Sequence, residues 1–319
     1  MKRSCKNILV LFVLTLLISA SNGQDVHFTQ FYSNPLYLSP SFAGATQQHR
    51  VASTYRNQWL GLPKGFSTYS FSYDHYFDNF NSGVGVLFLR DAAGSGNLGT
   101  TGASIFYSYD IQFHPLWHLR PGLSFSYLST GVQFSKLEFS SPTETSPAEY
   151  AGDFDAGVSC MVYSPRFWGG FDVAHLMQPN QSLYQDLSKI PVKFSVYGGY
   201  QIVQRGRLLQ PVEETISLAG LFKHQGQYNQ LDVGLYWFKM PMVLGIWYRG
   251  IPLLNSPYGD ALALLAGFKT KSFSFAYSYD FTISNLISST NGAHEISLIY
   301  EFTVKERKRK IHAIPCPEF

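Results

Sequence analysis

Residues 272–280 read Ser-Phe-Ser-Phe-Ala-Tyr-Ser-Tyr-Asp, so that aromatic side chains alternate with small or polar ones. Successive side chains of a β-strand point to opposite faces, and a period of two therefore indicates a strand whose faces meet different environments. The same alternation recurs at residues 69–74, 123–127 and 295–302. These segments predict an all-β protein.

Strand candidates of about ten residues fill most of the chain, which is the length that a tilted strand needs to cross a membrane. Roughly fourteen of them can be counted, and an even number is typical of outer-membrane barrels. They span residues 50–59, 66–77, 82–90, 98–110, 118–129, 154–163, 167–175, 192–204, 211–222, 228–238, 242–250, 260–269, 271–282 and 294–304.

The connections between these candidates separate two possible architectures, because alternation alone would also fit a soluble sandwich. The second, sixth, tenth and twelfth connections are tight, near residues 78–81, 164–166, 239–241 and 269–271. The long connections are all odd-numbered, at residues 130–153, 176–191, 251–259 and 283–293. Short turns on one side and long loops on the other predict a transmembrane antiparallel outer-membrane β-barrel with both mature termini in the periplasm.

The composition agrees with a membrane barrel better than with a soluble enzyme. Of the 319 residues, only 14% are charged and 16% are aromatic, and the formal charge of +3 is too small to imply a nucleic-acid partner. The tryptophans fall at or near predicted strand ends, as expected of rings at a membrane interface, although they would also suit a soluble core. They are Trp59, Trp117, Trp168, Trp237 and Trp247.

The first residues have the pattern of a secretory signal peptide. Lys2, Arg3 and Lys6 precede an apolar run over residues 8–18, and small residues follow it. We expect cleavage after Gly23, which would leave Gln24 at the mature end. No later apolar stretch is long enough for a membrane-spanning helix, so the mature protein is expected to be either secreted or an outer-membrane barrel.

Four regions follow from these patterns. Residues 1–23 form the signal peptide, and residues 24–49 lack sustained alternation and are expected to form a periplasmic arm or plug. Residues 50–304 form the transmembrane barrel. Residues 305–319 form a basic periplasmic tail.

The sequence carries no pattern that requires catalysis. A Gly-x-Gly-x-x-Gly stretch at residues 94–99 joins two predicted strands instead of opening a helix, so it lacks the context of a nucleotide site. No Gly-x-Ser-x-Gly motif and no zinc-binding histidine spacing occur. We therefore expect no catalytic residue, no metal site and no cofactor.

Several stretches resemble the PorP/SprF family. Residues 24–44 read QDVHFTQFYSNPLYLSPSFAG, which is similar to the mature start of that family. Residues 55–59 (YRNQW) and 69–74 (YSFSYD) continue the likeness in order, as do residues 277–286 (YSYDFTISNL) and 294–298 (HEISL). The likeness spans nearly the whole mature chain.

This resemblance implies an outer-membrane protein of Bacteroidota that works in type IX protein secretion, with some members supporting export or surface attachment of gliding adhesins. It implies two protein partners, namely the C-terminal domain of a secreted cargo protein or adhesin and periplasmic lipoproteins of the secretion machinery. It implies no enzymatic activity. Outer-membrane lipid would surround the barrel.

Together, these patterns lead to a hypothesis about which parts of the chain meet partners. The arm would close the barrel from the periplasmic side or dock an accessory protein, and the loops at 130–153 and 176–191 would hold the cargo domain. A passive porin for small solutes and a secreted soluble β-rich adhesin domain remain as alternatives. The candidate partner-binding residues of the arm are His27, Phe28, Gln30, Phe31, Asn34, Pro35 and Leu36.

Overall fold

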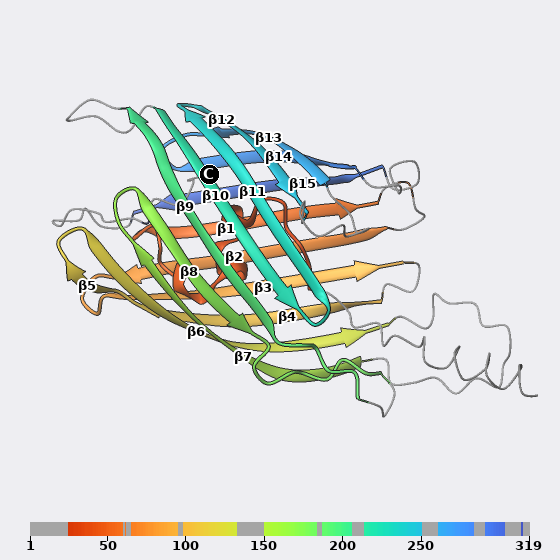
Figure 1. The fold of residues 1–319 in the computed structure, drawn as a ribbon. Coiled ribbons are helices and arrows are strands. Elements are labelled where there is room, and N and C mark those ends of the chain that lie inside the picture. The colour runs from red at the N-terminus through yellow and green to blue at the C-terminus, as the bar shows by residue number, and fades with distance from the viewer. Residues whose placement is uncertain are drawn as a thin grey trace, which may run out of the picture.

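The computed structural model describes residues 25–59, 61, 65–94, 98–132, 150–183, 187–205, 214–250, 261–283, 291–303 and 314. They form one closed antiparallel barrel around a short N-terminal segment (Figure 1). The signal peptide and its expected cleavage point between Gly23 and Gln24 lie outside the described residues. No helix of the described part is long and apolar enough to span a membrane.

The wall consists of strands that each pair with their neighbours in the chain. They are β1 (His49–Gln58), β2 (Phe66–Phe77), β3 (Ser82–Ala93), β4 (Leu98–Tyr109), β5 (Ile111–His114), β6 (Trp117–Gly131), β7 (Tyr150–Tyr163), β8 (Phe167–Ala174), β9 (Lys193–Arg205), β10 (Glu214–Gln225), β11 (Tyr228–Lys239), β12 (Met242–Arg249), β13 (Ala261–Lys269), β14 (Phe273–Thr282) and β15 (Ala293–Phe302). The barrel closes where β1 pairs with β15, from His49 opposite Phe302 to Gln58 opposite Ala293.

The predicted count of fourteen barrel strands is confirmed, because β4 and β5 together occupy one position in the wall. Both pair with β6, β4 from Gly99 to Ser108 and β5 from Ile111 onward. The ladder is interrupted at Asp110, whose backbone N–H donates instead to the carbonyl oxygen of Asn81 over 2.8 Å. Fifteen strands in sequence therefore make fourteen positions around the barrel.

The two mouths of the barrel differ as the connections predicted. We call the end that carries the connections at residues 78–81, 115–116, 164–166, 206–213, 240–241 and 270–272 the turn mouth. The opposite end, where the chain passes from β1 to β2, β3 to β4, β6 to β7, β8 to β9, β10 to β11, β12 to β13 and β14 to β15, is the loop mouth. In the outer-membrane arrangement the longer loops face the outside of the cell.

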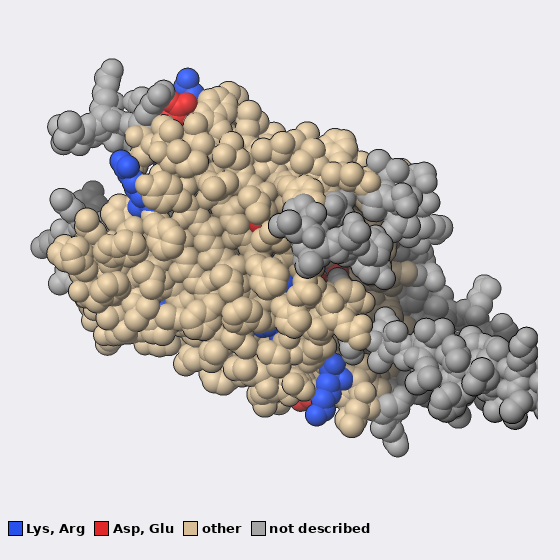
Figure 2. All heavy atoms as spheres, viewed as in Figure 1, with Lys and Arg blue, Asp and Glu red and all other residues tan. Residues whose placement is uncertain are grey.

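The strands carry apolar side chains on the outside of the barrel and polar side chains on the inside, which is the reverse of a soluble protein. In β2, Tyr69 and Phe71 are 54% and 46% exposed on the outside of the barrel, whereas Ser70 and Ser72 are each 3% exposed and face the lumen. An apolar outer face has no stabilising contact in water but suits lipid, while the polar inner face needs partners of its own. Figure 2 shows the consequence on one side of the molecule, where few charged side chains interrupt the middle of the exterior. The alternative of a soluble adhesin domain is therefore wrong.

Two of the five tryptophans depart from their expected place at the membrane interface. Trp168 and Trp247 are 1% and 3% exposed and point into the lumen. Each lies at a lumen-facing position of its strand. The prediction used only their position near strand ends, which does not distinguish the lumen-facing side of a strand from the lipid-facing side. They belong to the buried apolar cluster described below.

The N-terminal segment runs the length of the lumen, and we call residues 25–46 the plug. It contains three short helical turns, η1 (Phe31–Ser33), α2 (Pro35–Leu38) and η2 (Pro40–Phe42). Pro35 and Pro40 each open a turn, because proline has no backbone N–H to leave unpaired at that position. Proline and the missing alternation explain why this segment does not add a strand to the wall.

The two ends of the plug lie at opposite mouths. Asp25 contacts His175 and Lys193, which flank the connection between β8 and β9 at the loop mouth. The plug then ends at the turn mouth, where β1 begins at His49. The expectation that both mature termini lie on the same side is therefore wrong, because the segment crosses the lumen before the first strand. In the outer-membrane arrangement, Asp25 lies at the outward-facing mouth.

Replacing a lipid-facing side chain by a charged one separates this inverted barrel from a soluble protein. We expect Phe71→Arg, at the middle of β2, to lower the free energy of unfolding by about 2–4 kcal/mol in lipid vesicles. Phe77→Arg is the matched control at the end of the same strand, with an expected loss of about 0–1 kcal/mol. Urea titration of the refolded barrel measures both, and equal small losses would contradict the membrane-facing assignment of β2.

Candidate functional site

The contact between the plug and the inner wall is the most densely connected polar region of the described chain. Buried backbone N–H and C=O groups need hydrogen-bond partners, and a segment with only three short turns satisfies few of them internally. The wall supplies the missing partners from side chains on its lumen-facing positions. Polar clusters in the middle of the lumen and at both mouths hold the plug in this way.

The central cluster joins β1, β14 and β15 to residues 29 and 30 of the plug. Arg56 forms ion pairs with Asp280 at 2.8 Å and Glu295 at 3.2 Å. The two oxygens of Glu295 accept the backbone N–H groups of Thr29 at 2.7 Å and Gln30 at 2.9 Å. Because Glu295 is fully buried, these are charge-assisted hydrogen bonds in a region without bulk water.

The hydroxyl of Thr29 completes this cluster. Its oxygen lies 2.7 Å and 2.8 Å from the two carboxylate oxygens of Asp280 and also accepts a hydrogen bond from Arg56. Arg249 on β12 adds a second cation, with its guanidinium 3.1 Å from Asp280. Two arginines and two carboxylates from four strands therefore converge on one residue of the plug.

A second cluster fixes the plug at the turn mouth. Arg50 on β1 pairs with Asp74 on β2 at 2.8 Å, and the other oxygen of Asp74 accepts the backbone N–H of Gly44 at 2.8 Å. Gly44 has a φ of 67°, which glycine adopts without strain, and the chain turns there from the plug toward β1.

A third group of contacts binds η2 to β4, β6 and β7. The backbone N–H of Ser41 donates to the hydroxyl of Ser159 over 3.0 Å, and the Ser41 hydroxyl donates to the carbonyl oxygen of Arg120 over 2.8 Å. The guanidinium of Arg120 donates to the carbonyl oxygen of Ala43 and to Ser108. A Cβ on Gly122 would lie 2.5 Å from the backbone nitrogen of Ser41, so glycine allows this close approach.

Aromatic side chains fill the space between these polar clusters. The ring of Phe31 meets Trp247 edge to face at a centroid distance of 5.0 Å, and Tyr32 meets Tyr236 in the same way at 4.5 Å. Phe42 packs against Trp168 at 5.9 Å. These contacts explain why two tryptophans face the lumen.

Apolar contacts of the plug reach around most of the wall. One buried cluster includes Phe31, Tyr32, Leu38 and Phe42 of the plug together with residues of β1 and of β7 to β15. A second joins Leu36 and Ala43 to β3 and β4. The backbone N–H of Ile314, in the tail, donates to the carbonyl oxygen of Ala45 over 3.3 Å at the turn mouth.

At the loop mouth the plug begins with an ion-pair network that we call the latch, made of Asp25, Asp155, His175 and Lys193. Asp25 lies 2.6 Å from the Lys193 ammonium and 2.9 Å from Nε2 of His175. The other ring nitrogen of His175 lies 2.7 Å from Asp155. Burial alone would raise the pKa of Asp25, but the two neighbouring cations hold it well below its usual range.

The same network shifts the pKa of His175 in the opposite direction. Burial disfavours its charged form, but Asp25 and Asp155 outweigh burial and raise the pKa of His175 to about 9. Two residues further along the plug, His27 is half-buried, and burial together with Arg249 and Lys223 lowers its pKa well below the usual value. His175 is therefore a cation at neutral pH.

All seven candidate partner-binding residues lie in the plug, and the structure brings them together inside the barrel. Phe28, Gln30, Phe31, Asn34, Pro35 and Leu36 are buried, and His27 is half-buried. Asn34 donates to Thr54 over 2.9 Å and accepts from Ser70 over 2.5 Å. Their contacts are thus with the wall of the same chain, and a role in binding another protein stays a prediction.

Sequence reasoning missed the wall residues that hold the plug. They are charged residues at single lumen-facing positions of strands that are far apart in sequence, such as Arg56, Asp280 and Glu295. The available signal was a charged side chain on the polar face of an alternating strand. Within the described residues, no group of three or more His, Cys, Asp or Glu is arranged to hold a metal ion.

Comparisons with known proteins agree with this architecture. A family model described as "Type IX secretion system membrane protein PorP/SprF" matches residues 20–300. No curated protein matches the chain in sequence. Among solved structures, the CymD monoaromatic hydrocarbon channel is similar with a TM-score of 0.50 at 9% identity, covering 85% of this chain and 93% of that one. The Acinetobacter baumannii outer membrane protein Omp33 has a TM-score of 0.49 at 9% identity, covering 81% and 100%.

Loss of one wall carboxylate tests whether the central cluster holds the plug. In Glu295→Gln we expect amide hydrogen exchange in residues 25–46 to become more than tenfold faster, because a hydrogen bond to a charged group contributes about 1.5–3 kcal/mol. Exchange measured by mass spectrometry on the detergent-solubilised protein gives the rate. Exchange of residues 25–46 at the parent rate in Glu295→Gln would contradict the assignment.

The latch should loosen at alkaline pH. Because the pKa of His175 rises from an ordinary value of about 6.5 to about 9 in the folded state, its stabilisation is complete below about pH 6.5 and is lost as the pH rises through about 9. A nitroxide on Val26→Cys, with Cys160 and Cys316 replaced by Ser, should become more mobile between pH 8 and pH 10. In His175→Gln the mobility of the label should not change between pH 8 and pH 10, because the group that titrates is absent, and a flat profile in the parent would contradict the latch.

Proposed function

The chain belongs to the PorP/SprF family of type IX secretion system membrane proteins, and we propose that it is a plugged outer-membrane barrel that holds the C-terminal domain of a secreted cargo protein or adhesin. In this proposal the barrel is a rigid membrane anchor and does not catalyse a reaction. Cargo binds at the loop mouth, and periplasmic lipoproteins of the secretion machinery bind at the turn mouth.

The observation that carries the proposal is the plug. Its buried polar clusters and its aromatic contacts occupy the lumen from Asp25 to Ala45. A passive porin needs a continuous polar passage, and the plug occupies part of the lumen that such a passage would use. The filled lumen therefore supports an anchoring role over the alternative of a small-solute channel.

The loop mouth has features that suit a protein partner. In the connection between β8 and β9, Leu176, Met177 and Leu187 are 45%, 59% and 80% exposed. The described part of this connection is ordered by backbone contacts, because Asn180 and Lys189 form a β-bridge and the backbone N–H of Leu176 donates to the carbonyl oxygen of Ala156 over 3.0 Å. Exposed apolar side chains on a fixed loop outside the lipid-facing wall support docking of a protein surface.

Two charged substitutions on this loop test the proposal. Met177→Asp combined with Leu187→Asp should weaken binding of the purified C-terminal domain of a cargo protein of type IX secretion by at least tenfold. The physical reason is that apolar side chains at an interface centre lose their contacts when they are replaced by a hydrated carboxylate. Binding is measured with the full barrel in lipid nanodiscs.

The matched control is Phe113→Asp combined with Leu116→Asp, which places the same charges on exposed apolar positions at the turn mouth. Cargo binding should be unchanged in that control. Equal weakening in both variants would show that the loop mouth is not the cargo site. A steady open pore in planar bilayers, with no retained cargo domain, would overturn the proposal in favour of the porin alternative.

A further inference from the structure

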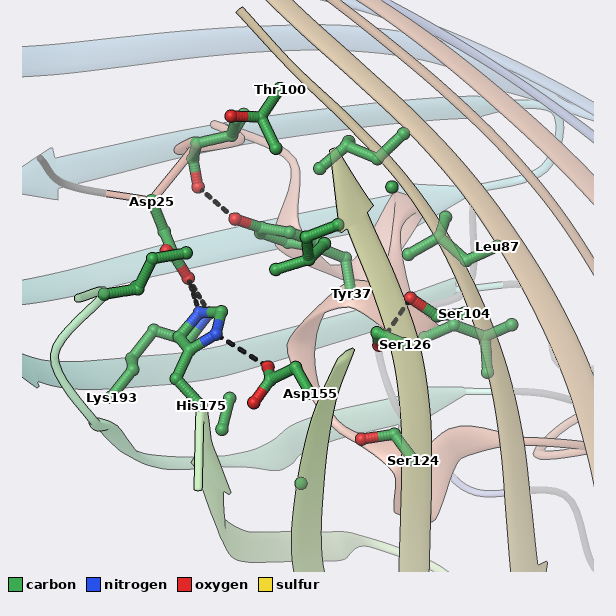
Figure 3. A pocket seen from close by; sticks show the side chains of 18 of the residues that line it. Asp25, Tyr37, Leu87, Thr100, Ser104, Ser124, Ser126, Asp155, His175 and Lys193 are labelled. Atoms are coloured by element: carbon green, nitrogen blue, oxygen red, sulfur yellow. Dashed lines mark hydrogen bonds and ion pairs between the residues drawn. The ribbon is translucent and has the colours of Figure 1, made fainter. Parts of the chain in front are cut away.

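A cavity of about 160 Å³ lies beside the plug near the loop mouth (Figure 3). One side of it is formed by the plug at Asp25 and Tyr37, and the other by the inner wall from β3 to β8. The wall leaves this space because its lumen-facing residues here are small. They are Gly102, Ser104, Ser124, Ser126, Gly157 and Ala174.

Buried polar groups of the lining lack partners among the described residues of the chain. One carboxylate oxygen of Asp155 has none, while the other contacts His175. Asp172 on β8 is 3% exposed, and Lys193 and His175 act on its carboxylate through charge alone. Ser124 on β6, which is 9% exposed, lines the same cavity. Such groups need a partner from outside the chain, which is water or a bound molecule.

The charges around the cavity do not balance. Four carboxylates line it, those of Asp25, Asp91, Asp155 and Asp172, against the two cations Lys193 and His175. Both cations are already bound in the latch, where Asp25 and Asp155 are their partners. Asp91 accepts only the neutral hydroxyl of Thr68, at 2.6 Å. The lining therefore has more carboxyl groups than cations, and a bound cation would stabilise the ionised form of Asp172, which burial disfavours.

The remaining lining is apolar. Leu36 of the plug and Leu87, Leu89, Phe106 and Leu128 of the wall face the same space. A bare metal ion would make no use of this surface, and within the described residues no group of three or more His, Cys, Asp or Glu is arranged to hold one. An apolar side next to unpaired carboxylates fits a molecule with a hydrocarbon part and a positively charged end.

We propose that this cavity binds a small organic ammonium compound. The ammonium group lies against Asp172 and Ser124, and the hydrocarbon part lies against the leucines of β3 and β6. A cavity of about 150 Å³ is large enough for benzene, which limits the hydrocarbon part to about that size. This site is separate from the cargo surface proposed above and does not depend on it.

Benzylamine is a suitable probe, with benzyl alcohol and benzoate as neutral and anionic analogues of the same shape. Titration calorimetry on the full-length chain in detergent should detect benzylamine binding at least tenfold tighter than benzyl alcohol and no binding of benzoate. Asp172→Asn should weaken benzylamine binding at least tenfold. Ser124→Leu keeps every charge but fills the cavity, and should weaken binding by a similar factor.

Asp78→Asn is the matched control, because it removes the same charge from an exposed turn at the opposite mouth. Its benzylamine affinity should equal that of the parent. Heat-dependent gel migration of each variant confirms a closed barrel, and Ser124→Leu tests the site independently if Asp172→Asn fails to fold. Absence of benzylamine binding overturns the proposal. Equal affinity in the parent and both cavity variants, or equal affinity for the alcohol, also overturns it.

Discussion

The pairing of buried charges between the plug and the wall is the constraint on which the rest of this structure depends. A barrel in lipid places its apolar side chains outside, so its polar side chains gather in the lumen, where each buried charge needs a partner. Arg56, Asp280 and Glu295 form one such group, and the backbone N–H groups of Thr29 and Gln30 complete it. The plug therefore supplies hydrogen-bond partners to buried charges of the wall, and the wall supplies partners to backbone groups of the plug.

This mutual dependence explains why so irregular a segment has a defined position. Its three short turns would not be stable alone, because a single turn fixes several backbone angles for few hydrogen bonds. Binding sites on opposite sides of the lumen instead fix the segment from outside, at Glu295 in the middle and at Asp74 near the turn mouth. Aromatic contacts such as Phe31 with Trp247 fill the space between these polar points.

The sequence predicted the wall well and the interior poorly, for physical reasons. Alternation in residues 272–280 and its repeats reports which side chains share a face, and the strand positions and the count of fourteen followed from it. It does not report contacts between faces, so the pairing of Arg56 with residues more than 220 positions away could not be found. The route of the plug was missed because residues 25–46 have no period, and only the wall contacts of Asp25 reveal at which mouth the segment begins.

The two ends of the plug are held in different ways, and this determines which end a bound partner could displace. At the turn mouth the plug continues covalently into β1, whereas at the loop mouth it is held by noncovalent contacts, which are the latch and the hydrogen bonds between Asp25 and Gln225. His175 belongs to this latch, lines the cavity and begins the loop that carries Met177 and Leu187. If the proposed partner weakens the latch by some factor when it binds this loop, linkage requires that opening of the latch strengthens binding of the partner by the same factor. The position of His175, between the latch and this loop, is where such coupling would act.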